Sequence, residues 1–267
     1  MIPSNYHTHT HFCDGKDSPE EIVCQAIRLG CPELGFSGHS YTAFDERYCI
    51  SKTGARAYIA AIRALQEAYR DKIHIRVGIE QDYFSDVPTD EYDYVIGSVH
   101  YVKKDGCYLP VDESRQIQVD NVRRFYNGDF YSFIEDYYET VSDVYRKTRC
   151  QIVGHFDLIT KFNRQHDLFD PQHPRYQAAA GKALAALMDA PVTLEVNTGG
   201  IARGYTAEPY PARDLLTQWL AAGKPILYSS DCHKAEQLLF GYDIYKAHIR
   251  MCSPDGSHIQ EKMTLRF

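Results

Sequence analysis

The stretch TGARAYIAAIRALQEAYRDKIHIRVGIEQD, residues 53–82, contains one complete unit of the pattern that organises this chain. Apolar residues recur with helical period over 53–70, and the short apolar run at 73–82 is typical of a buried strand. Strands that alternate with amphipathic helices indicate β-α units around a parallel sheet. Similar runs recur along the chain, and the predicted strands are 2–11, 34–39, 73–82, 92–100, 150–157, 192–199 and 225–233.

The segments between the predicted strands carry helix signals. Ser18 as N-cap, Pro19 in the first turn and Glu21 closing a capping box predict a helix start. Seven strand units without a break in composition predict a single domain over residues 1–267. We expect the fold class to be α/β, with the strands closed into a seven-stranded, TIM-like barrel.

One interval, residues 101–149, is longer than the alternation needs. It begins with a turn-rich stretch at 101–111 and continues as a Tyr-rich run of helical period. The simpler interpretation is a barrel helix with an apolar face, and the alternative makes 101–111 part of a substrate lid. The expected apolar face consists of Phe130, Phe133, Ile134, Tyr137, Val141 and Val144.

Composition excludes several classes of protein. The 267 residues carry a formal net charge of −7 and no basic run, which argues against a nucleic-acid or anionic-membrane surface. No apolar stretch approaches the roughly 20 residues that span a bilayer. The first residues lack the pattern of a signal peptide, and the eight cysteines form no Cys-x-x-Cys pair. We therefore expect a cytoplasmic protein with reduced thiols.

Six of the seven predicted strands finish in, or just before, a His, Asp or Glu. The carboxyl-terminal mouth is where barrels of this kind carry their active sites, so closure of the barrel would gather these side chains. Imidazole and carboxylate ligands together suit zinc, manganese or iron better than magnesium. The nine predicted metal ligands are His7, His9, Asp14, His39, Glu80, His100, His155, Asp231 and His233.

The first predicted strand shows why two histidines stand so close together. Side chains at i and i+2 of a strand point to the same face, so His7 and His9 would bind one ion together. His11 shares that parity but follows the expected strand end, where it either supports a ligand or lies on the rim. Cys232 separates Asp231 from His233, and the alternation turns its side chain toward the packing side.

Short motifs around these residues resemble the polymerase and histidinol phosphatase (PHP) superfamily. They run in the order of that family from residue 5 to about residue 245, and GSVH, GHFDLITKF and EVNTGG resemble its histidinol-phosphatase branch. The motifs are HTH (7–9), CDG (13–15), GHS (38–40), GIE (78–80), GSVH (97–100), GHFD (154–157) and SSDCH (229–233).

The resemblance implies a distorted seven-stranded barrel, or (β/α)7 fold, with two to three divalent transition metal ions. Glu80 would bridge the first two metals, of which the second is held by His100 and His155. A third metal would be bound by His39, His233 and the acidic loop residue, here Asp14. The first metal would take His7, His9, Glu80 and Asp231.

The expected chemistry is hydrolysis of a phosphate ester by a hydroxide that bridges two of the metals. Asp231 and His233 are the candidates to protonate the leaving oxygen through a water molecule, and Glu80 is the third catalytic residue. Expected phosphate contacts are Arg203, Lys161 and Asn197, of which Asn197 either touches substrate or orients a ligand. Glu195 is expected to support a ligand from behind.

The resemblance favours hydrolysis of L-histidinol phosphate in histidine biosynthesis. The alternative keeps the metals and changes the substrate to another small phosphomonoester or a nucleotide. A third hypothesis is a metal-binding domain without catalysis, although the expected ligand set has no gap. The expected partner is thus a small phosphate ester, with neither nucleic acid nor membrane. The sequence leaves the oligomeric state open.

Overall fold

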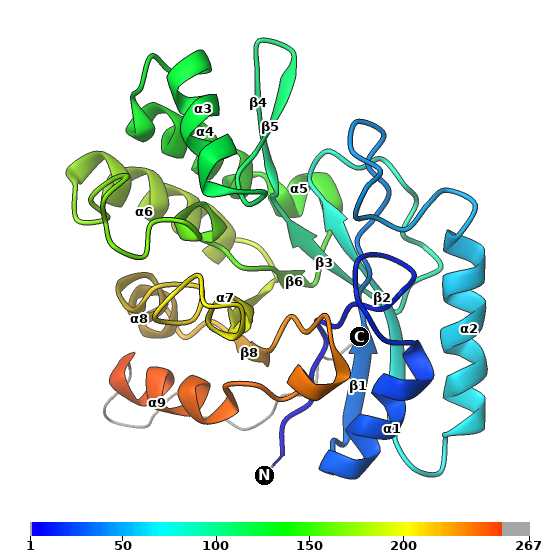
Figure 1. Cartoon of the computed structure of the whole chain (residues 1–267). Helices are drawn as coiled ribbons and strands as arrows, with labels where there is room; N and C mark the ends of the chain where they lie inside the picture. The colour runs from blue at the N-terminus through cyan, green and yellow to red at the C-terminus, as the bar shows by residue number, and fades with distance from the viewer. Residues whose placement is uncertain (1, 253–267) are drawn as a thin grey trace.

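The computed structural model describes residues 2–252 and has an α/β fold built on a curled, parallel sheet (Figure 1). Six strands pair in the order β1-β2-β3-β6-β7-β8, and all five ladders are parallel. The predicted α/β class and six of the seven predicted strands are therefore confirmed. The strands are β1 (Glu33–Phe36), β2 (His74–Asp82), β3 (Tyr94–Ser98), β6 (Ile152–Val153), β7 (Thr193–Asn197) and β8 (Ile226–Ser229).

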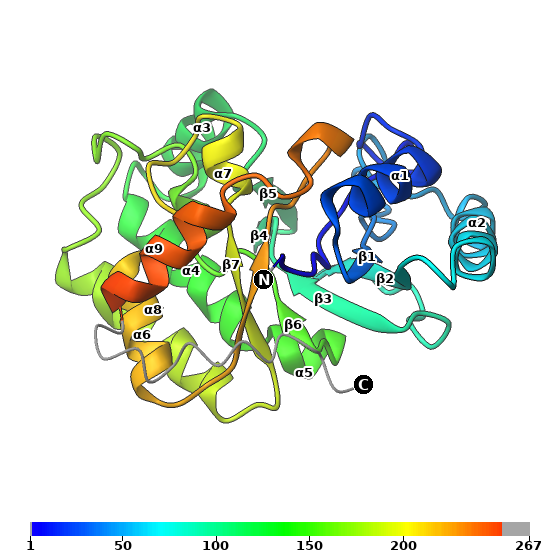
Figure 2. The same ribbon diagram turned by 90° about the horizontal axis from the view of Figure 1, so that it is seen from below.

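Helices cover the outer side of the curled sheet. Figure 2 shows α1 and α2 beside β1 and β2, with α4, α6, α8 and α9 on the opposite side of the molecule. The helices of the described chain are α1 (Pro19–Leu29), α2 (Ala55–Ala68), α3 (Arg115–Phe125), α4 (Phe130–Ser142), α5 (Val144–Thr148), α6 (Pro174–Met188), α7 (Gly199–Ala202), α8 (Arg213–Ala221) and α9 (Tyr242–Cys252), with 3-10 turns η1 (Leu158–Thr160) and η2 (Ala235–Gln237).

The predicted capping box begins α1 as expected. The Ser18 hydroxyl accepts from the backbone N–H of Glu21, and the Glu21 carboxylate accepts from the backbone N–H of Ser18. Ile22, Val23 and Ala26 of this helix are buried in the main hydrophobic cluster. The local signal thus fixes where the helix begins, and its apolar stripe fixes which side packs on the sheet.

The closed seven-stranded barrel is not confirmed, because residues 2–11 form no regular strand. This segment makes two single parallel bridges, from Asn5 to Leu34 beside β1 and from Thr8 to Cys232 beyond β8. It therefore lies between the two edges of the six-stranded sheet without a continuous ladder to either. The structure is a curled sheet with a threaded N-terminal segment at its opening.

A bulge explains why the ladder to β1 fails. The carbonyls of Asn5 and Thr8 accept from the backbone N–H groups of Gly35 and Ser37, respectively. The three residue steps from Asn5 to Thr8 therefore lie opposite only the two steps from Gly35 to Ser37, which is a bulge. The carbonyl of Tyr6, within the bulge, accepts instead from the Tyr94 hydroxyl. A strand pattern in the sequence carries no sign of such an extra residue.

Tyr94 can reach that carbonyl because β2 has no side chain in its path. A Cβ placed on Gly78 would lie 2.3 Å from the Tyr94 ring, closer than any real contact allows. The same hydroxyl also donates to the carbonyl of Phe36 at 3.0 Å. Gly78 is thus required by a close approach between neighbouring strands.

The long interval after β3 forms a hairpin followed by helices. Strands β4 (Tyr101–Lys104) and β5 (Cys107–Pro110) pair antiparallel, and α3, α4 and α5 follow. Of the predicted apolar face, all but the partly buried Phe130 lie in the core of the protein. Among the residues that the structure describes, no helix is both long and apolar enough to cross a bilayer.

Candidate metal centre

The nine predicted ligands meet at the carboxyl ends of the parallel strands. Glu80 lies within β2, while the other carriers follow the ends of their strands or sit in the N-terminal segment. Potential ligand atoms fall into four groups whose members all lie within 4.8 Å of one another. The groups are His9, Asp14, His39 and His233; His7, Glu80 and His155; His7, His9 and Asp231; and His39, Glu80 and His100.

Glu80 stands at the middle of this cluster. Its carboxylate faces five imidazoles, although the residue is only 1% exposed. Its Oε2 atom lies 3.2 Å from His7 Nε2, 3.5 Å from His9 Nε2 and 2.8 Å from His39 Nδ1. Its Oε1 atom lies 3.4 Å from His100 Nε2 and 2.9 Å from His155 Nε2. One carboxylate that touches two sets of imidazoles is suited to bridging two ions.

Four of these atoms have the spacing of ligands around a tetrahedral ion. The Nε2 atoms of His7 and His9 lie 3.2 and 3.5 Å from Glu80 Oε2, and 3.7 and 3.3 Å from Asp231 Oδ1. Ligand bonds of about 2.1 Å in tetrahedral geometry separate neighbouring ligands by about 3.4 Å. Both Nε2 atoms and Glu80 Oε2 are buried without a hydrogen-bond partner among the described residues. The side chains therefore fit a metal ion.

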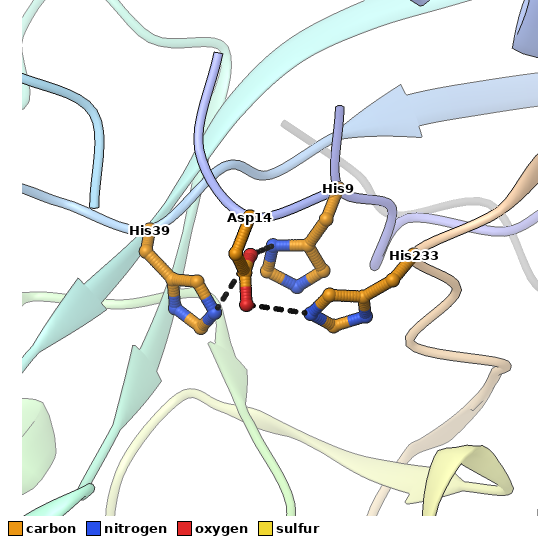
Figure 3. Close-up of side chains that lie close together, drawn as sticks. All are labelled: His9, Asp14, His39 and His233. Carbon is orange, nitrogen blue, oxygen red and sulfur yellow. Dashed lines mark ion pairs between the residues drawn. The ribbon is translucent and has the colours of Figure 1, made fainter. Parts of the chain in front are cut away.

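A second group lies toward the opening of the site (Figure 3). Asp14 stands between three imidazoles, at 3.8 Å from His9 Nδ1, 3.7 Å from His39 Nε2 and 3.3 Å from His233 Nε2. The predicted set contained Asp14, His39 and His233, and the structure adds the second nitrogen of His9. His9 therefore faces both groups, one with each ring nitrogen.

Charges within the cluster set the protonation of its members. Burial would raise the pKa of Glu80, but the positive charges of His39 and His7 hold it well below its usual range. Burial opposes charge on His7 as well, yet Glu195 and Glu80 raise its pKa well above its usual value. Burial and the neighbouring His233 lower the pKa of His9 to about 3. His9 thus keeps the neutral form that metal ligation requires, whereas His7 would release its proton on binding a metal ion.

Asp231 reaches the cluster through an unusual backbone conformation. Its φ of 46° lies in the left-handed region, which Asp tolerates better than most residues. Burial would raise its pKa, but the Arg203 guanidinium, 2.8 Å away, and His7 hold it well below the usual range. Asp231 is therefore an anion in the folded protein at neutral pH.

Buried acceptors behind the cluster orient its imidazoles. Glu195 accepts from His7 Nδ1 at 2.5 Å, and Asp82 lies 3.1 Å from His100 Nδ1. The role expected of Glu195 agrees with this contact. Asp82 was not among the predicted residues, although it shares strand parity with Glu80 and that signal could have identified it.

The cluster opens into a cavity of about 340 Å³ whose lining includes both predicted cations. Arg203 donates to the carboxylate and the carbonyl of Asp231, and Lys161 donates to Asp112 at 3.1 Å. Asn197 does not line this cavity. Its amide contacts Glu195 at 3.0 Å and Asp231 at 3.3 Å, which places it to orient a ligand.

The remaining predicted features lie around the centre. His11 is exposed and stacks on Phe12, so it belongs to the rim. Cys232 is buried in the hydrophobic cluster. The 101–111 stretch contributes Tyr101 and Pro110 to the cavity wall, and the loop at 40–50 contributes Asp45, Arg47 and Tyr48.

The family follows from a comparison of the whole sequence. The family model described as the PHP domain matches residues 5–199, which include seven of the nine clustered ligands. The chain belongs to the PHP family. The PHP match ends before Asp231 and His233, which the structure nevertheless brings to the same centre.

Curated PHP relatives resemble this chain over most of its length. The "Probable histidinol-phosphatase" of Deinococcus radiodurans is 29% identical over 247 residues, covering 88% of this chain and 88% of the relative. The "Histidinol-phosphatase" of Bacillus subtilis is 26% identical over 265 residues, covering 90% of this chain and 96% of the relative.

Two solved structures share the fold. A Listeria monocytogenes protein superposes with a TM-score of 0.79 at 23% identity, covering 91% of this chain and 99% of the other. The histidinol phosphate phosphatase of Lactococcus lactis, solved with zinc, L-histidinol and phosphate, gives a TM-score of 0.66 at 21% identity and 94% coverage of both chains. The curled sheet of this PHP protein is thus shared with both structures.

Proposed function

We propose that this chain is a metal-dependent phosphatase that hydrolyses L-histidinol phosphate to L-histidinol and phosphate. The observation that carries the proposal is the buried Glu80 carboxylate facing five imidazoles at the base of a cavity that Arg203 also lines. The names of the relatives from D. radiodurans and B. subtilis, and the ligands reported for the L. lactis structure, support the choice of substrate.

The clustered residues would hold two or three divalent transition metal ions. Zinc, manganese and iron fit the mixed nitrogen and oxygen donors. Such ions lower the pKa of water and offset the negative charge that develops on phosphate oxygens. The binding sets we propose are His7, His9, Glu80 and Asp231; Glu80, His100 and His155; and His9, Asp14, His39 and His233.

The two cations of the cavity wall would bind and orient the phosphate. The Arg203 guanidinium is held by Asp231, and its side chain is 29% exposed, so donors remain on the cavity side. A guanidinium can bind two phosphate oxygens at once, whereas the Lys161 ammonium adds a single positive charge. Asp112 holds Lys161 at the wall in the same way that Asp231 holds Arg203.

Proton transfer to the leaving oxygen needs a group that can give up a proton. The depressed pKa of Asp231 keeps it ionised, so this carboxylate can accept a proton but has none to donate. Of the two predicted candidates, we therefore assign the role to His233, acting through a water molecule because its imidazole also belongs to a proposed metal-binding set. Its Nδ1 lies 3.2 Å from an Arg203 nitrogen and 3.1 Å from the carbonyl of Asp231, beside the proposed phosphate position.

The far side of the cavity suits a leaving group with positive charge. The carboxylates of Asp45 and Glu113 line it, and Arg47 joins the two by ion pairs of 2.7 and 2.9 Å. Tyr48 and Tyr101 provide aromatic surface beside them. Histidinol phosphate carries an ammonium group and an imidazole at the end opposite the phosphate, which is the charge distribution that this wall would favour.

A chelation experiment tests the proposal. Purified protein is treated with a chelator, and phosphate release is measured before treatment, after it, and after adding zinc, manganese or iron. Activity should disappear and return with metal. The substrates are L-histidinol phosphate, p-nitrophenyl phosphate, glycerol phosphate and a nucleoside monophosphate. Activity that survives chelation contradicts the metal dependence, and a substrate other than L-histidinol phosphate with the highest kcat/KM contradicts the specificity.

Asp231→Asn is the matching variant, with Asp243→Asn as its control. Asp231 is buried in the centre, whereas Asp243 lies on α9 and pairs with Lys246 at the surface. We expect the first substitution to lower kcat/KM by at least about a thousandfold and the second to leave it unchanged. Equal activities in the two variants would remove Asp231 from the mechanism.

A further inference from the structure

A second cavity, of about 310 Å³, lies beside the wall of the metal centre and shares no lining residue with it. It forms where the segment from Asp157 to Tyr176 meets the segment from Thr206 to Asp214. Helices α6 and α8 pack against each other (Figure 1), and the first turn of each contributes to the lining of this cavity. Its volume is at the lower end of the range for small-molecule sites.

Three buried polar atoms of this cavity have no hydrogen-bond partner among the described residues. They are Asp157 Oδ1, Tyr210 Oη and Thr206 Oγ1. Asp157 is 1% and Tyr210 is 2% exposed. The other oxygen of Asp157 already accepts from the backbone N–H of Ala212 at 2.8 Å, which fixes the direction of the free one. Buried polar atoms without partners are rare in folded proteins, so these atoms indicate a ligand.

The two hydroxyls lie close enough to share one group. A single Cβ position built on Gly200 falls 2.7 Å from Thr206 Oγ1 and 3.0 Å from Tyr210 Oη. Both hydroxyl oxygens can accept a hydrogen bond, and Asp157 Oδ1 is a carboxylate acceptor. Burial, and to a lesser extent the charge of Glu208, raises the pKa of Asp157 to about 7, so a positive charge beside Oδ1 would stabilise its carboxylate form. Acceptors and negative charge together favour a ligand that donates several hydrogen bonds and is positively charged.

The rim of the same cavity has the opposite character. Arg164 and Arg213 line it, and within residues 2–252 neither forms an ion pair with a carboxylate. Arg164 donates only to the carbonyl of Gly204 at 3.1 Å, and Arg213 contacts the sulfur of Met251 at 3.3 Å. Each guanidinium therefore keeps donors for an anion.

We propose that this cavity binds a free α-amino acid, with its ammonium group on Asp157, Tyr210 and Thr206 and its carboxylate on Arg164. An ammonium group supplies three donors for the three acceptors, and the carboxylate complements the guanidinium at the rim. The ring of Tyr176 and Pro209 line the space that remains for the amino-acid side chain. This site is separate from the metal centre, and it stands whether or not the proposed phosphatase activity is correct.

Isothermal titration calorimetry with the metal-loaded full-length protein tests the proposal. Each common L-amino acid is titrated at about 10 mM, which detects dissociation constants into the millimolar range. Saturating inorganic phosphate is present throughout to occupy the metal centre. We expect at least one amino acid to bind with one site per chain. Absence of binding by every amino acid would mean that the cavity holds water only, and it would overturn the proposal.

Two derivatives and two variants locate the bound amino acid. Its N-acetyl derivative, which lacks the ammonium, should not bind, and its amide, which lacks the carboxylate, should bind about tenfold more weakly. Tyr210→Phe removes only a hydroxyl without a partner, so the fold should persist while affinity falls about tenfold. Arg164→Gln should weaken the amino acid about tenfold and leave the binding of the amide unchanged.

Tyr145→Phe on α5, outside the lining of this cavity, is the matched control and should bind as the unmodified protein does. Melting temperatures without ligand show whether each variant is folded. If Tyr210→Phe and Arg164→Gln are folded and bind the amino acid with unchanged affinity, binding occurs elsewhere and the assignment of this cavity is wrong.

Discussion

Replacement of Glu195 by Gln tests how far the metal centre depends on the residues behind it. Glu195 is fully buried and accepts three hydrogen bonds, from His7 Nδ1 at 2.5 Å, the backbone N–H of His155 at 2.7 Å and the Asn197 amide at 3.0 Å. Glutamine has the same shape but only one acceptor oxygen and a donor in place of the other. It cannot satisfy all three partners.

Either orientation of the Gln side chain damages the site. With its oxygen toward His155, the amide nitrogen faces His7 Nδ1, and the imidazole must move its proton to Nε2. That tautomer removes the lone pair with which His7 would bind metal. With its oxygen toward His7, the amide nitrogen faces two other donors, which leaves buried N–H groups unsatisfied at about 1–3 kcal/mol.

We therefore expect Glu195→Gln to weaken metal binding roughly 10- to 100-fold, equal to about 1.4–2.8 kcal/mol. Competition with a metal chelator of known affinity measures this change, and kcat/KM at rising metal concentration should recover in the variant. The control is Glu67→Gln, an exposed residue paired with Arg70, which should change neither quantity. An unchanged metal affinity in a folded Glu195→Gln protein would show that Glu195 does not orient His7 for metal binding.

Three further outcomes are expected. Gly78→Ala should lower the free energy of unfolding by at least about 2 kcal/mol in urea titrations, because the new Cβ would meet the Tyr94 ring at 2.3 Å. An unchanged midpoint of urea unfolding would contradict this close approach. Arg203→Gln should raise KM and lower kcat/KM about a hundredfold, whereas a steady-state assay showing wild-type values would exclude phosphate binding by Arg203. Asp129, the N-cap of α4, is paired with Arg175, and although burial opposes the shift, hydrogen bonds from Ser132 and Arg175 lower its pKa to about 2. The stability that Asp129 contributes to the fold is therefore present above the unfolded pKa near 4 and lost as the pH falls toward 2. Asp129→Ala should lower the free energy of unfolding by about 1 kcal/mol at pH 7 and by progressively less from pH 4 downward, as thermal melts can measure. A difference independent of pH would contradict the assignment.

Local sequence signals predicted helices and strands well where one short stretch contains the whole cause. The capping box at Ser18 and Glu21 is an example, since both partners lie within one helical turn. The clustering of the nine predicted ligands could be expected, because parallel strands that alternate with helices bring their carboxyl ends together. This holds whatever side chains lie between those ends. Glu80 lies in β2, and His100 follows the end of the neighbouring strand β3.

Features that depend on contacts distant in sequence were not predictable. At the bulge, the carbonyl of Tyr6 accepts a hydrogen bond from the hydroxyl of Tyr94, 88 residues away in the sequence. The pairing of Lys161 with Asp112 depends on the path of the chain after the hairpin. Neither contact affects the periodicity of the sequence. The regularity of the first segment was therefore overestimated, and nothing in the sequence indicated that Asp112 holds Lys161.

Elemental analysis of the protein, purified without chelator and without added metal, shows whether the clustered side chains bind metal. We expect about two or three equivalents of zinc, manganese or iron per chain, and a lower content in a folded Glu80→Gln variant. Fresh protein that hydrolyses phosphate esters while it contains no stoichiometric transition metal would exclude metal-dependent hydrolysis.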